Sequence, residues 1–258
     1  MIRVEGLWKS FDGQPVLRGL SLEVGTGEIM VVIGRSGGGK SVLLKHMLGL
    51  LHPDSGRIEV DGLDVARLRG AALDRVRERY GVVFQSGALF DSISVLDNVA
   101  FPLREKTRLP AAEVRARAEQ QLAQVGLTGM SHKNPAEISG GMRKRVAIAR
   151  ALVTEPRIVF FDEPTTGLDP ILVNAIHRLI LDLHRRLEFT AVVISHEIPE
   201  IFSIADRVAL LHEGVIVEEG SPEAILASAN PVVGQFIRGE ADASLLSAAM
   251  THPGRHPA

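Results

Sequence analysis

Short apolar runs alternate along the chain with longer stretches in which apolar residues recur every three or four positions. The runs are of strand length and end in turn or charged residues; they are 28–33, 157–161 and 190–195. Continuous apolar strands are typical of a sheet that is covered on both faces. The stretches with helical spacing are 41–51, 110–125, 171–187 and 197–203. This alternation predicts an α/β fold class.

Other regions depart from that alternation. Short strands are predicted at 1–27 (around a turn at 13–15), at 56–65 and at 207–217. Between about Gly87 and Val153 the spacing is helical, which predicts an inserted helical region. Beyond about Glu240 the chain becomes rich in alanine and predicts a frayed tail.

Composition narrows the class of protein. The 258 residues are 45% apolar and carry a net charge of −2, which favours one core with an inserted subdomain and does not suggest a nucleic-acid partner. Cysteine is missing from the sequence, so disulfides, thiolate zinc sites and cysteine nucleophiles are excluded. No apolar run approaches the ~18 residues that span a bilayer, and the N-terminus lacks the apolar core of a signal peptide. We expect a soluble, cytoplasmic protein. If the protein works at a membrane, we expect a partner to hold it there.

The first candidate site is a glycine-rich loop after the apolar run 28–33. It matches the pattern G-x-x-x-x-G-K-[ST] with Gly34, Arg35, Ser36, Gly37, Gly38, Gly39, Lys40 and Ser41. Its backbone N–H groups can converge on phosphate oxygens, and the helix that follows adds its positive end. Lys40 can reach the β- and γ-phosphates, and the Ser41 hydroxyl can ligate Mg²⁺. The alternative is a turn without a ligand, and the pattern does not separate kinases, GTPases and ATPases.

A second candidate site lies where the run 157–161 ends in two carboxylates, Asp162 and Glu163. Alone, this pattern also fits a buried strand with a solvated end. Together with a phosphate loop it predicts that Asp162 holds Mg²⁺, directly or through water, and that Glu163 polarises the attacking water. Phosphoryl transfer depends mainly on positioning and charge neutralisation, which such groups supply.

The most informative segment is 138–145, Ile-Ser-Gly-Gly-Met-Arg-Lys-Arg. It predicts a second glycine turn that opens a helix, and a helix N-terminus is an anion-binding surface. The segment resembles the signature motif of ATP-binding cassette (ABC) ATPases, with Met142 where most members have Gln. Taken with the phosphate loop and the acidic strand end, it makes the chain similar to ABC transporter ATP-binding subunits from residue 1 to about 240.

The resemblance assigns roles to further residues. Phe11 lies where the family places an aromatic ring that stacks on adenine, with ordinary strand packing as the alternative. Gln85 resembles the Q-loop glutamine, which touches Mg²⁺ and senses the membrane partner. Asp169, in Thr-Gly-Leu-Asp, resembles the D-loop that crosses the dimer interface. His196 resembles the switch histidine that contacts the γ-phosphate, and six motifs in the family's order favour this role over a structural one.

The same resemblance implies a RecA-like P-loop ATPase core with an N-terminal antiparallel β subdomain and an inserted α-helical subdomain. The expected divisions are 1–86 (β subdomain and first half of the core), 87–154 (helical subdomain), 155–238 (second half of the core) and 239–258 (tail). The implied cofactors are ATP and Mg²⁺. The family forms a head-to-tail homodimer, in which each ATP lies between one phosphate loop and the partner's signature motif. In this chain the signature residues are Ser139, Gly140, Gly141 and Met142.

Segments outside the catalytic motifs narrow the resemblance. Residues 81–99, 101–105 and 234–242, together with Met142, resemble the ATPases of Mla phospholipid transporters. This implies an integral-membrane permease, an MCE-domain lipid-binding subunit and a small accessory subunit as partners, at the cytoplasmic face of the bacterial inner membrane. An importer for another small solute is an alternative. A soluble ABC ATPase is disfavoured because the chain has no long coiled-coil insertion, and a degenerate cassette because the catalytic motifs are intact.

Two expectations concern surfaces. Residues 85–97 are apolar and rich in turns, which predicts a groove for a cytoplasmic helix of the permease. The basic run of Arg143, Lys144 and Arg145 is expected to form a solvated face of the helix. The alternative is a contact with phosphate or across the dimer. The Trp8 side chain is expected to serve packing alone. The histidines other than His196 match no motif and show no metal-ligand spacing.

Overall fold

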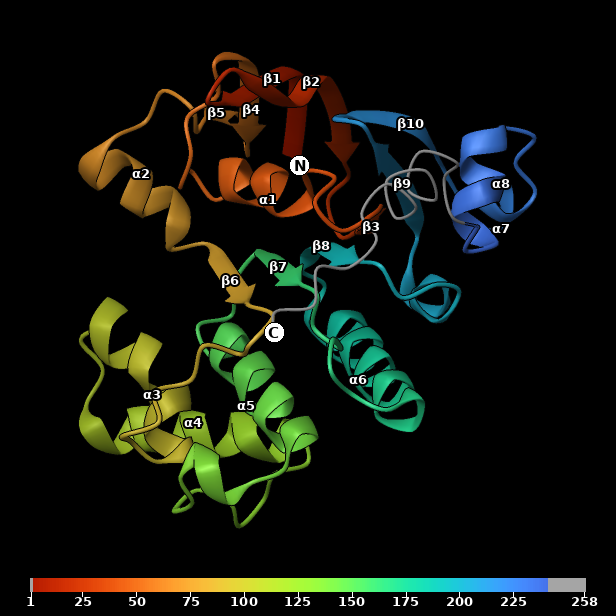
Figure 1. Cartoon of the computed structure of the whole chain (residues 1–258). Coiled ribbons are helices and arrows are strands. Elements are labelled where there is room, and N and C mark those ends of the chain that lie inside the picture. Colours follow the sequence, from red (N-terminus) through yellow and green to blue (C-terminus); the bar gives the residue numbers. More distant parts are fainter. Residues whose placement is uncertain (1, 241–258) are drawn as a thin grey trace, which may run out of the picture.

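The computed structural model of the chain describes residues 2–240, and the tail predicted beyond residue 240 lies outside the described residues. Within the described part the strands form two sheets (Figure 1). The antiparallel sheet has the order β2-β1-β4-β5, with β1 Ile2–Phe11, β2 Gln14–Val24, β4 Ser55–Val60 and β5 Leu63–Asp64. The central sheet has the order β10-β9-β3-β8-β7-β6, with β3 Ile29–Ile33, β6 Tyr80–Val83, β7 Ile158–Asp162, β8 Thr190–Ser195, β9 Arg207–His212 and β10 Val215–Gly220.

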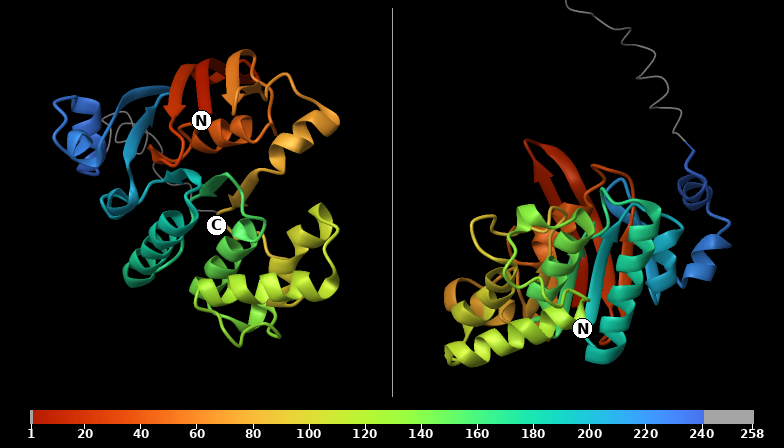
Figure 2. Two further views of the ribbon diagram at one scale, coloured as in Figure 1. Left: turned by 180° about the vertical axis from the view of Figure 1, so that it is seen from behind. Right: turned by 90° about the horizontal axis from the view of Figure 1, so that it is seen from below.

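Helices fill the space around these sheets (Figures 1 and 2). They are α1 Lys40–Met47, α2 Gly70–Arg77, α3 Val95–Lys106, α4 Ala111–Gln124, α5 Gly140–Leu152, α6 Pro170–Leu187, α7 Pro222–Leu226 and α8 Pro231–Ile237, with 3-10 turns η1 Pro135–Glu137 and η2 Glu200–Ile204. Helices α3, α4 and α5 pack on one another between β6 and β7 in the chain and form a body below the central sheet in Figure 1. Helix α1 lies between the two sheets.

The central sheet is buried on both faces, as its continuous apolar strands predict. Along β3, Ile29, Val31 and Ile33 pack into a core shared with the helical body, and they are at most 1% exposed. Met30 and Val32 point to the opposite face, into a core shared with α1 and the antiparallel sheet. Burying side chains of this size stabilises the fold by roughly 1.5–3 kcal/mol each. The alternating side chains of β3 therefore place the helical body on one face of the central sheet, and α1 with the antiparallel sheet on the other. The predicted α/β class is confirmed.

The strands that carry the candidate motifs are neighbours in the central sheet. Strands β3, β8, β7 and β6 lie side by side and run parallel. Their carboxyl ends therefore share one edge, which is where ligands bind in open α/β sheets. The residues that follow these ends are Gly34 after β3, His196 after β8, Glu163 after β7 and Gln85 in the segment after β6. The order of the strands thus collects motifs that are far apart in sequence.

Several predicted elements differ from the structure. Helix α1 ends at Met47, before Gly49, whose φ of +66° stops the helix. The helix expected at 197–203 is wrong; only η2 forms, because the residue before Pro199 is disfavoured in helical geometry. Helices α2, α7 and α8 were not expected individually. The division of the chain at residues 86, 154 and 238 stays a prediction.

Candidate functional site

The phosphate loop is built from glycines that the surrounding backbone requires. A Cβ on Gly34 would lie 2.3 Å from the Leu211 carbonyl oxygen, and Gly39 has a φ of +100°. Gly39 is also the N-cap of α1, and as a glycine it has no side chain that could accept a hydrogen bond from the first turn of the helix. The N–H groups of the first turn of α1 therefore point into the loop, as an anion site needs.

Lys40 lies folded against this loop. Its side chain is 5% exposed, and Nζ donates to the carbonyl oxygens of Gly34 at 2.7 Å and Arg35 at 3.0 Å. Burial lowers the pKa of Lys40, while Glu163 and Asp162 act in the opposite direction. The acid pair of β7 thus lies close enough to Lys40 to favour its charged form.

Asp162 at the end of β7 lies beside the first residues of α1. Burial is the main cause that raises the pKa of Asp162, and neighbouring Glu163 adds to it; Lys45, Lys40 and a hydrogen bond from the Ser41 side chain oppose the rise. The Ser41 hydroxyl and the Asp162 carboxylate are therefore adjacent oxygen donors. This donor set suits Mg²⁺, which prefers oxygen ligands and usually binds one or two carboxylates beside a phosphate.

Glu163 is the point where three motifs meet. Its Oε2 accepts hydrogen bonds from Gln85 Nε2 at 3.1 Å and from Thr166 Oγ1 at 3.0 Å. Its Oε1 lies 3.2 Å from His196 Nδ1. The backbone of Glu163 is left-handed, with a φ of 47°, and its N–H donates to the Ile194 carbonyl at 3.0 Å. A non-glycine residue in this region is strained, by roughly 1–3 kcal/mol, and such strain clusters at functional sites.

A cavity of about 320 Å³ joins the phosphate loop to this carboxylate. Its lining residues are Ser36, Gly37, Gly39, Lys40, Ser41, Val42, Gln85 and Glu163. The structure therefore brings together the phosphate loop, Gln85 and Glu163, with His196 in contact with the last.

The signature residues lie elsewhere on the chain. Ser139 is the N-cap of α5 and accepts from the Met142 N–H at 3.3 Å. A Cβ on Gly141 would lie 3.4 Å from the Leu172 side chain, just beyond the loop that ends at Asp169. Asp169 caps α6, because its Oδ1 accepts from the N–H groups of the second and third residues of that helix. The signature turn therefore faces the D-loop region, and it does not line the cavity around the chain's own phosphate loop.

Phe11 ends β1 beside the phosphate loop. It pairs with Gln14, and the carbonyl of nearby Val16 would lie 3.3 Å from a Cβ on Gly39. The ring is 41% exposed, with Lys9 Nζ 5.4 Å from its centroid. The ring is not packed away within the sheet, and its stacking on adenine stays a prediction. Trp8 packs against Gly19 but keeps 45% of its surface exposed, so packing describes it only in part.

The basic run after the signature motif is solvated only in part, because Arg143 is exposed but Lys144 is buried. Lys144 is 8% exposed, and its Nζ donates to the Gln85 carbonyl oxygen at 2.5 Å. Helical spacing places Lys144 on the same side of α5 as buried Ala147 and Ile148, which is why the expectation was wrong for this residue. The guanidinium of Arg143 donates to the Ile138 carbonyl at 2.8 Å.

Sequence reasoning also missed a link behind the site. The hydroxyl of Thr165, which is 1% exposed, donates to the Glu197 carboxylate. Glu197 directly follows His196, so the link ties the D-loop segment to the strand end that carries the switch histidine. The sequence did offer one signal for both residues: Glu197 follows the motif residue His196, and Lys144 lies in the segment that carries the signature motif.

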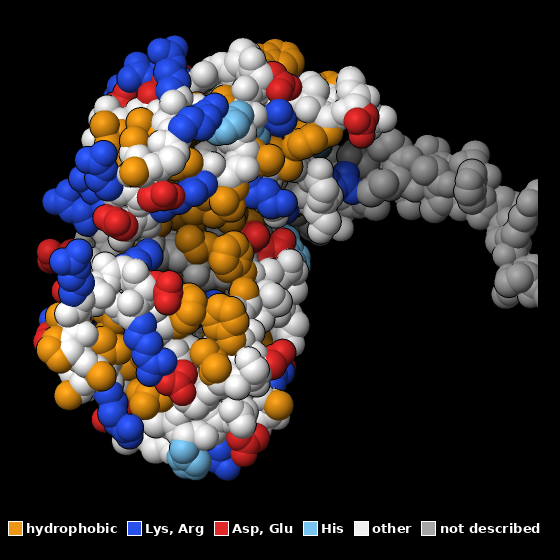
Figure 3. Space-filling view, turned by 90° about the vertical axis from the view of Figure 1, so that its left-hand side faces the viewer, with side chains coloured by type: hydrophobic (Ala, Val, Ile, Leu, Met, Phe, Trp, Pro, Cys, Tyr) orange, Lys and Arg blue, Asp and Glu red, His pale blue; other side chains and the backbone are white. Residues whose placement is uncertain are grey.

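An apolar groove is lined by residues on both sides of Gln85 in the chain. Its volume is about 340 Å³, and Phe84, Phe90, Phe101 and Pro102 contribute to its lining. The Phe90 and Phe101 rings lie 4.9 Å apart at their centroids and are 44% and 38% exposed. Figure 3 shows apolar side chains gathered in the middle of this side of the molecule. The groove falls within and beside the segment 85–97 that the sequence singled out.

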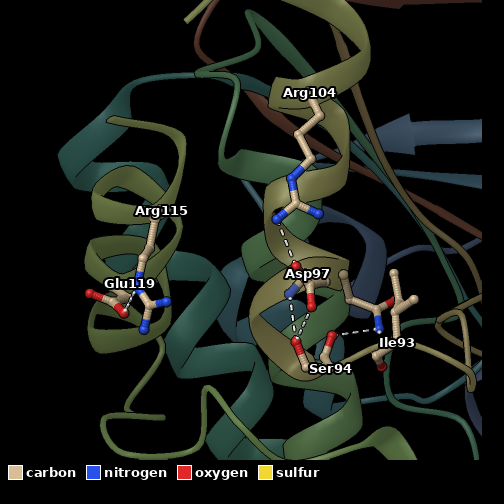
Figure 4. Close-up of polar contacts among 7 residues, drawn as sticks. Ile93, Ser94, Asp97, Arg104, Arg115 and Glu119 are labelled. Atoms are coloured by element: carbon tan, nitrogen blue, oxygen red, sulfur yellow. Dashed lines mark hydrogen bonds and ion pairs between the residues drawn. The ribbon is translucent and has the colours of Figure 1, made fainter. Parts of the chain in front are cut away.

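The wall of this groove is held by the first turn of α3. Asn98 is fully buried; its Nδ2 donates to the carbonyls of Phe90 and Ser94, both at 3.0 Å, and its Oδ1 accepts from the Phe90 N–H at 2.8 Å. Ser94 caps the helix by accepting from the Asp97 N–H, and Arg104 donates to Asp97 at 2.7 Å (Figure 4). The backbone around Phe90 is therefore held to α3 by hydrogen bonds.

Among residues 2–240, every helix is too short or too polar to cross a membrane. A family model described as ABC transporter matches residues 17–166. The chain is 43% identical over 242 residues to the "Intermembrane phospholipid transport system ATP-binding protein MlaF" of Haemophilus influenzae, covering 94% of this chain and 92% of that protein. It is 42% identical over 238 residues to the "Probable ribonucleotide transport ATP-binding protein mkl" of Mycobacterium tuberculosis, covering 92% of this chain and 66% of that protein.

Solved structures give the same result. The cbiO1 structure from Clostridium perfringens, described as part of the cbiONQ transporter complex, aligns with a TM-score of 0.82 at 32% identity, over 97% of this chain and 98% of that one. The ATP-binding cassette MJ0796, in a dimeric post-hydrolysis state bound to ADP and phosphate, aligns with a TM-score of 0.79 at 30% identity, over 86% and 99%. The chain therefore belongs to the ABC transporter family, as one of its ATPase cassettes.

Proposed function

We propose that the chain is the ATP-hydrolysing motor of a transporter that moves phospholipid between the membranes of a bacterial envelope and so maintains the lipid asymmetry of the outer membrane. The observation that carries the proposal is the meeting of Gln85 and His196 at Glu163, together with an apolar groove whose lining includes Phe84, the residue before that glutamine. The name of the Haemophilus relative, MlaF, supports phospholipid as the cargo.

The proposed chemistry follows from the contacts. Ser41, Asp162 and Gln85 hold Mg²⁺, which neutralises charge on the phosphates when it is bound. The phosphate loop and Lys40 orient the γ-phosphate. Glu163, with its carboxylate held by Gln85 and Thr166, orients and polarises the attacking water. His196 contacts the γ-phosphate from the neighbouring strand end.

The proposed catalytic unit is a homodimer. Ser139, Gly140 and Gly141 do not line the cavity of their own phosphate loop, so we infer that they bind the ATP held by the partner chain. Each ATP then favours the closed dimer, and its hydrolysis removes the charge that stabilised that state. Asp169 lies at the interface between the two chains.

The proposed assembly includes subunits besides the ATPase. The groove of Phe84, Phe90 and Phe101 receives a cytoplasmic helix of an integral-membrane permease, which holds the ATPase at the cytoplasmic face of the inner membrane. An MCE-domain lipid-binding subunit and a small accessory subunit complete the transporter. A second candidate function is transport of another small solute. It is supported by the name of the mycobacterial relative, which mentions ribonucleotide transport.

Purification of the tagged chain from detergent-solubilised native membranes tests the proposal. We expect a permease and an MCE-domain protein to co-purify, together with phospholipid detected by mass spectrometry. The Phe90→Glu variant should lose the permease, whereas Leu226→Glu, an equally exposed apolar position on α7, should keep it. Co-purification of a solute-binding protein without lipid would favour the second candidate, and equal recovery of the permease with Phe90→Glu would exclude the groove as its docking site.

A further inference from the structure

Helix α5 grips the loop after β6 at three backbone carbonyl oxygens. Lys144 Nζ donates to the carbonyl of Gln85 at 2.5 Å. Arg150 donates through Nη2 to the carbonyl of Gly87 at 2.6 Å and through Nη1 to that of Ala88 at 2.7 Å. Hydrogen bonds from charged donors are stronger than neutral ones. The loop that carries Gln85 is therefore fastened to α5.

Lys144 is an unusual residue at its position. Its neighbours on the core side of α5 are Ala147 and Ile148, and lysine is almost never this buried unless it has a partner. Burial lowers the pKa of Lys144, but Glu197 and Glu163 oppose the shift. The ammonium group therefore contacts the Gln85 carbonyl and is near enough to Glu163 and Glu197 for their charges to act on it.

The contacts on either side of Lys144 join two distant functional groups. Ser139 caps the same helix five residues earlier, and a helix of this length moves as one body. Beyond Lys144, Gln85 turns its Nε2 to Glu163 Oε2 at 3.1 Å. A displacement of the α5 N-terminus therefore reaches the carboxylate through one ammonium–carbonyl contact and one glutamine side chain.

We propose that Lys144 is a positioning residue that sets Gln85 against Glu163 according to the position of α5. The inference rests on the proposed homodimer, in which Ser139 contacts the ATP of the partner chain. Lys144 then couples the ATP bound at a chain's signature motif to the carboxylate that hydrolyses the ATP at the same chain's phosphate loop. The two sites of the dimer hydrolyse ATP cooperatively as a consequence.

Steady-state ATP hydrolysis by the full-length chain with Mg²⁺ tests this coupling. Lys144→Met keeps the length of the side chain but removes the donor; it should lower kcat about 10- to 100-fold, as a small misplacement of a catalytic group does. The KM for ATP should change much less, and the dependence of rate on ATP should lose its sigmoidal shape. Lys144→Arg keeps a charged donor and should restore cooperativity.

Arg77→Met is the matched control, because Arg77 on α2 also donates to backbone carbonyls, those of Leu48 at 3.2 Å and Gly49 at 2.9 Å, away from Gln85. It should keep kcat and cooperativity. Wild-type kcat and cooperativity in Lys144→Met would overturn the proposal, as would an equal loss in Lys144→Met and Arg77→Met. Full activity of Ser139→Arg would instead refute the shared ATP site, so the two failures are distinguishable.

Discussion

At the scale of single residues, the proposed chemistry depends on how Glu163 is held. The carboxylate accepts hydrogen bonds from Gln85 and Thr166 and contacts His196, while its own backbone adopts a left-handed conformation. A group held from three sides is pre-oriented for a water molecule, and orientation of this kind lowers a reaction barrier without further rearrangement. The same contacts make the role of Glu163 directly testable.

Glu163→Gln should bind ATP and hold the closed dimer while turnover falls about 100- to 10,000-fold, because the amide cannot act as a base. Phosphate release measures turnover, and size-exclusion chromatography with ATP measures the dimer. Thr166→Ala removes one hydrogen bond to the carboxylate but keeps the charge, so its loss should be much smaller. Normal steady-state hydrolysis by Glu163→Gln would rule out the assigned role.

His177 makes a second prediction at this scale. It is 1% exposed on α6, and neither ring nitrogen has a hydrogen-bond partner within normal limits. Burial lowers the pKa of His177, against the influence of Glu197 and Glu200. The unfolded chain therefore takes up the proton more readily than the folded chain. The contribution to stability is complete above about pH 6.5, the unperturbed value, and is lost as the pH falls below it.

The temperature of the thermal midpoint should therefore decrease as the pH is lowered from about 7.5 to about 5.5, and His177→Leu should reduce that fall by a few degrees. Scanning calorimetry at both pH values measures the difference. His132→Gln changes an exposed histidine and should leave the fall as it is in the wild type. An unchanged fall in His177→Leu would show that this ring does not control the pH dependence.

At the scale of elements, the groove depends on the N-terminus of α3. Asn98 satisfies the N–H and carbonyl of Phe90 and the carbonyl of Ser94, so one buried side chain fixes the loop that presents the phenylalanine. Losing such a partner leaves buried backbone groups without hydrogen bonds. The proposed docking surface thus depends on Asn98, a buried side chain behind the groove.

Asn98→Ala should lower the free energy of unfolding by about 2 kcal/mol and increase hydrogen exchange in residues 88–94. Permease binding should weaken with it. Ser94→Ala removes the helix cap and the hydrogen bond from the Ser94 hydroxyl to the Asp97 carboxylate, and should cost about 1 kcal/mol without releasing Phe90. Equal exchange of the loop in the two variants would contradict the role given to Asn98.

Elements differed in how well the sequence predicted them. The strands 28–33, 157–161 and 190–195 were found because burial on both faces makes them apolar throughout. Helices α7 and α8 are short, with few buried residues, so periodicity could not reveal them. Their capping signals, Ser221-Pro222 and Asn230-Pro231, were present and would have located both helices.

At the scale of the whole molecule, the site is complete only in a pair of chains. Lys40→Ala disables the phosphate loop and Ser139→Arg disables the signature motif, so each variant alone should be inactive. A mixed dimer has one intact site, formed by the loop of one variant and the signature of the other. Equal mixing should therefore recover activity of at most about a quarter of the wild type.

Phosphate release from the mixture, compared with each variant alone, measures this recovery. Mixing either variant with a Lys40→Ala, Ser139→Arg double variant is the control, because Ser139→Arg then gains no intact signature and Lys40→Ala gains no intact phosphate loop. Activity of Ser139→Arg by itself, or no recovery among confirmed mixed dimers, would contradict the shared site.

The sequence alone determined the fold class and the motif residues, because glycine spacing and strand-end carboxylates carry their chemistry in the local chain. Tertiary structure decided how those residues meet. Only the strand order β3-β8-β7-β6 places Gln85 and His196 on Glu163. Lys144 was expected to be a surface charge, and only the packing of α5 shows that it is buried in contact with the Gln85 carbonyl. Periodicity along one helix cannot show what covers its face, because that depends on residues distant in sequence.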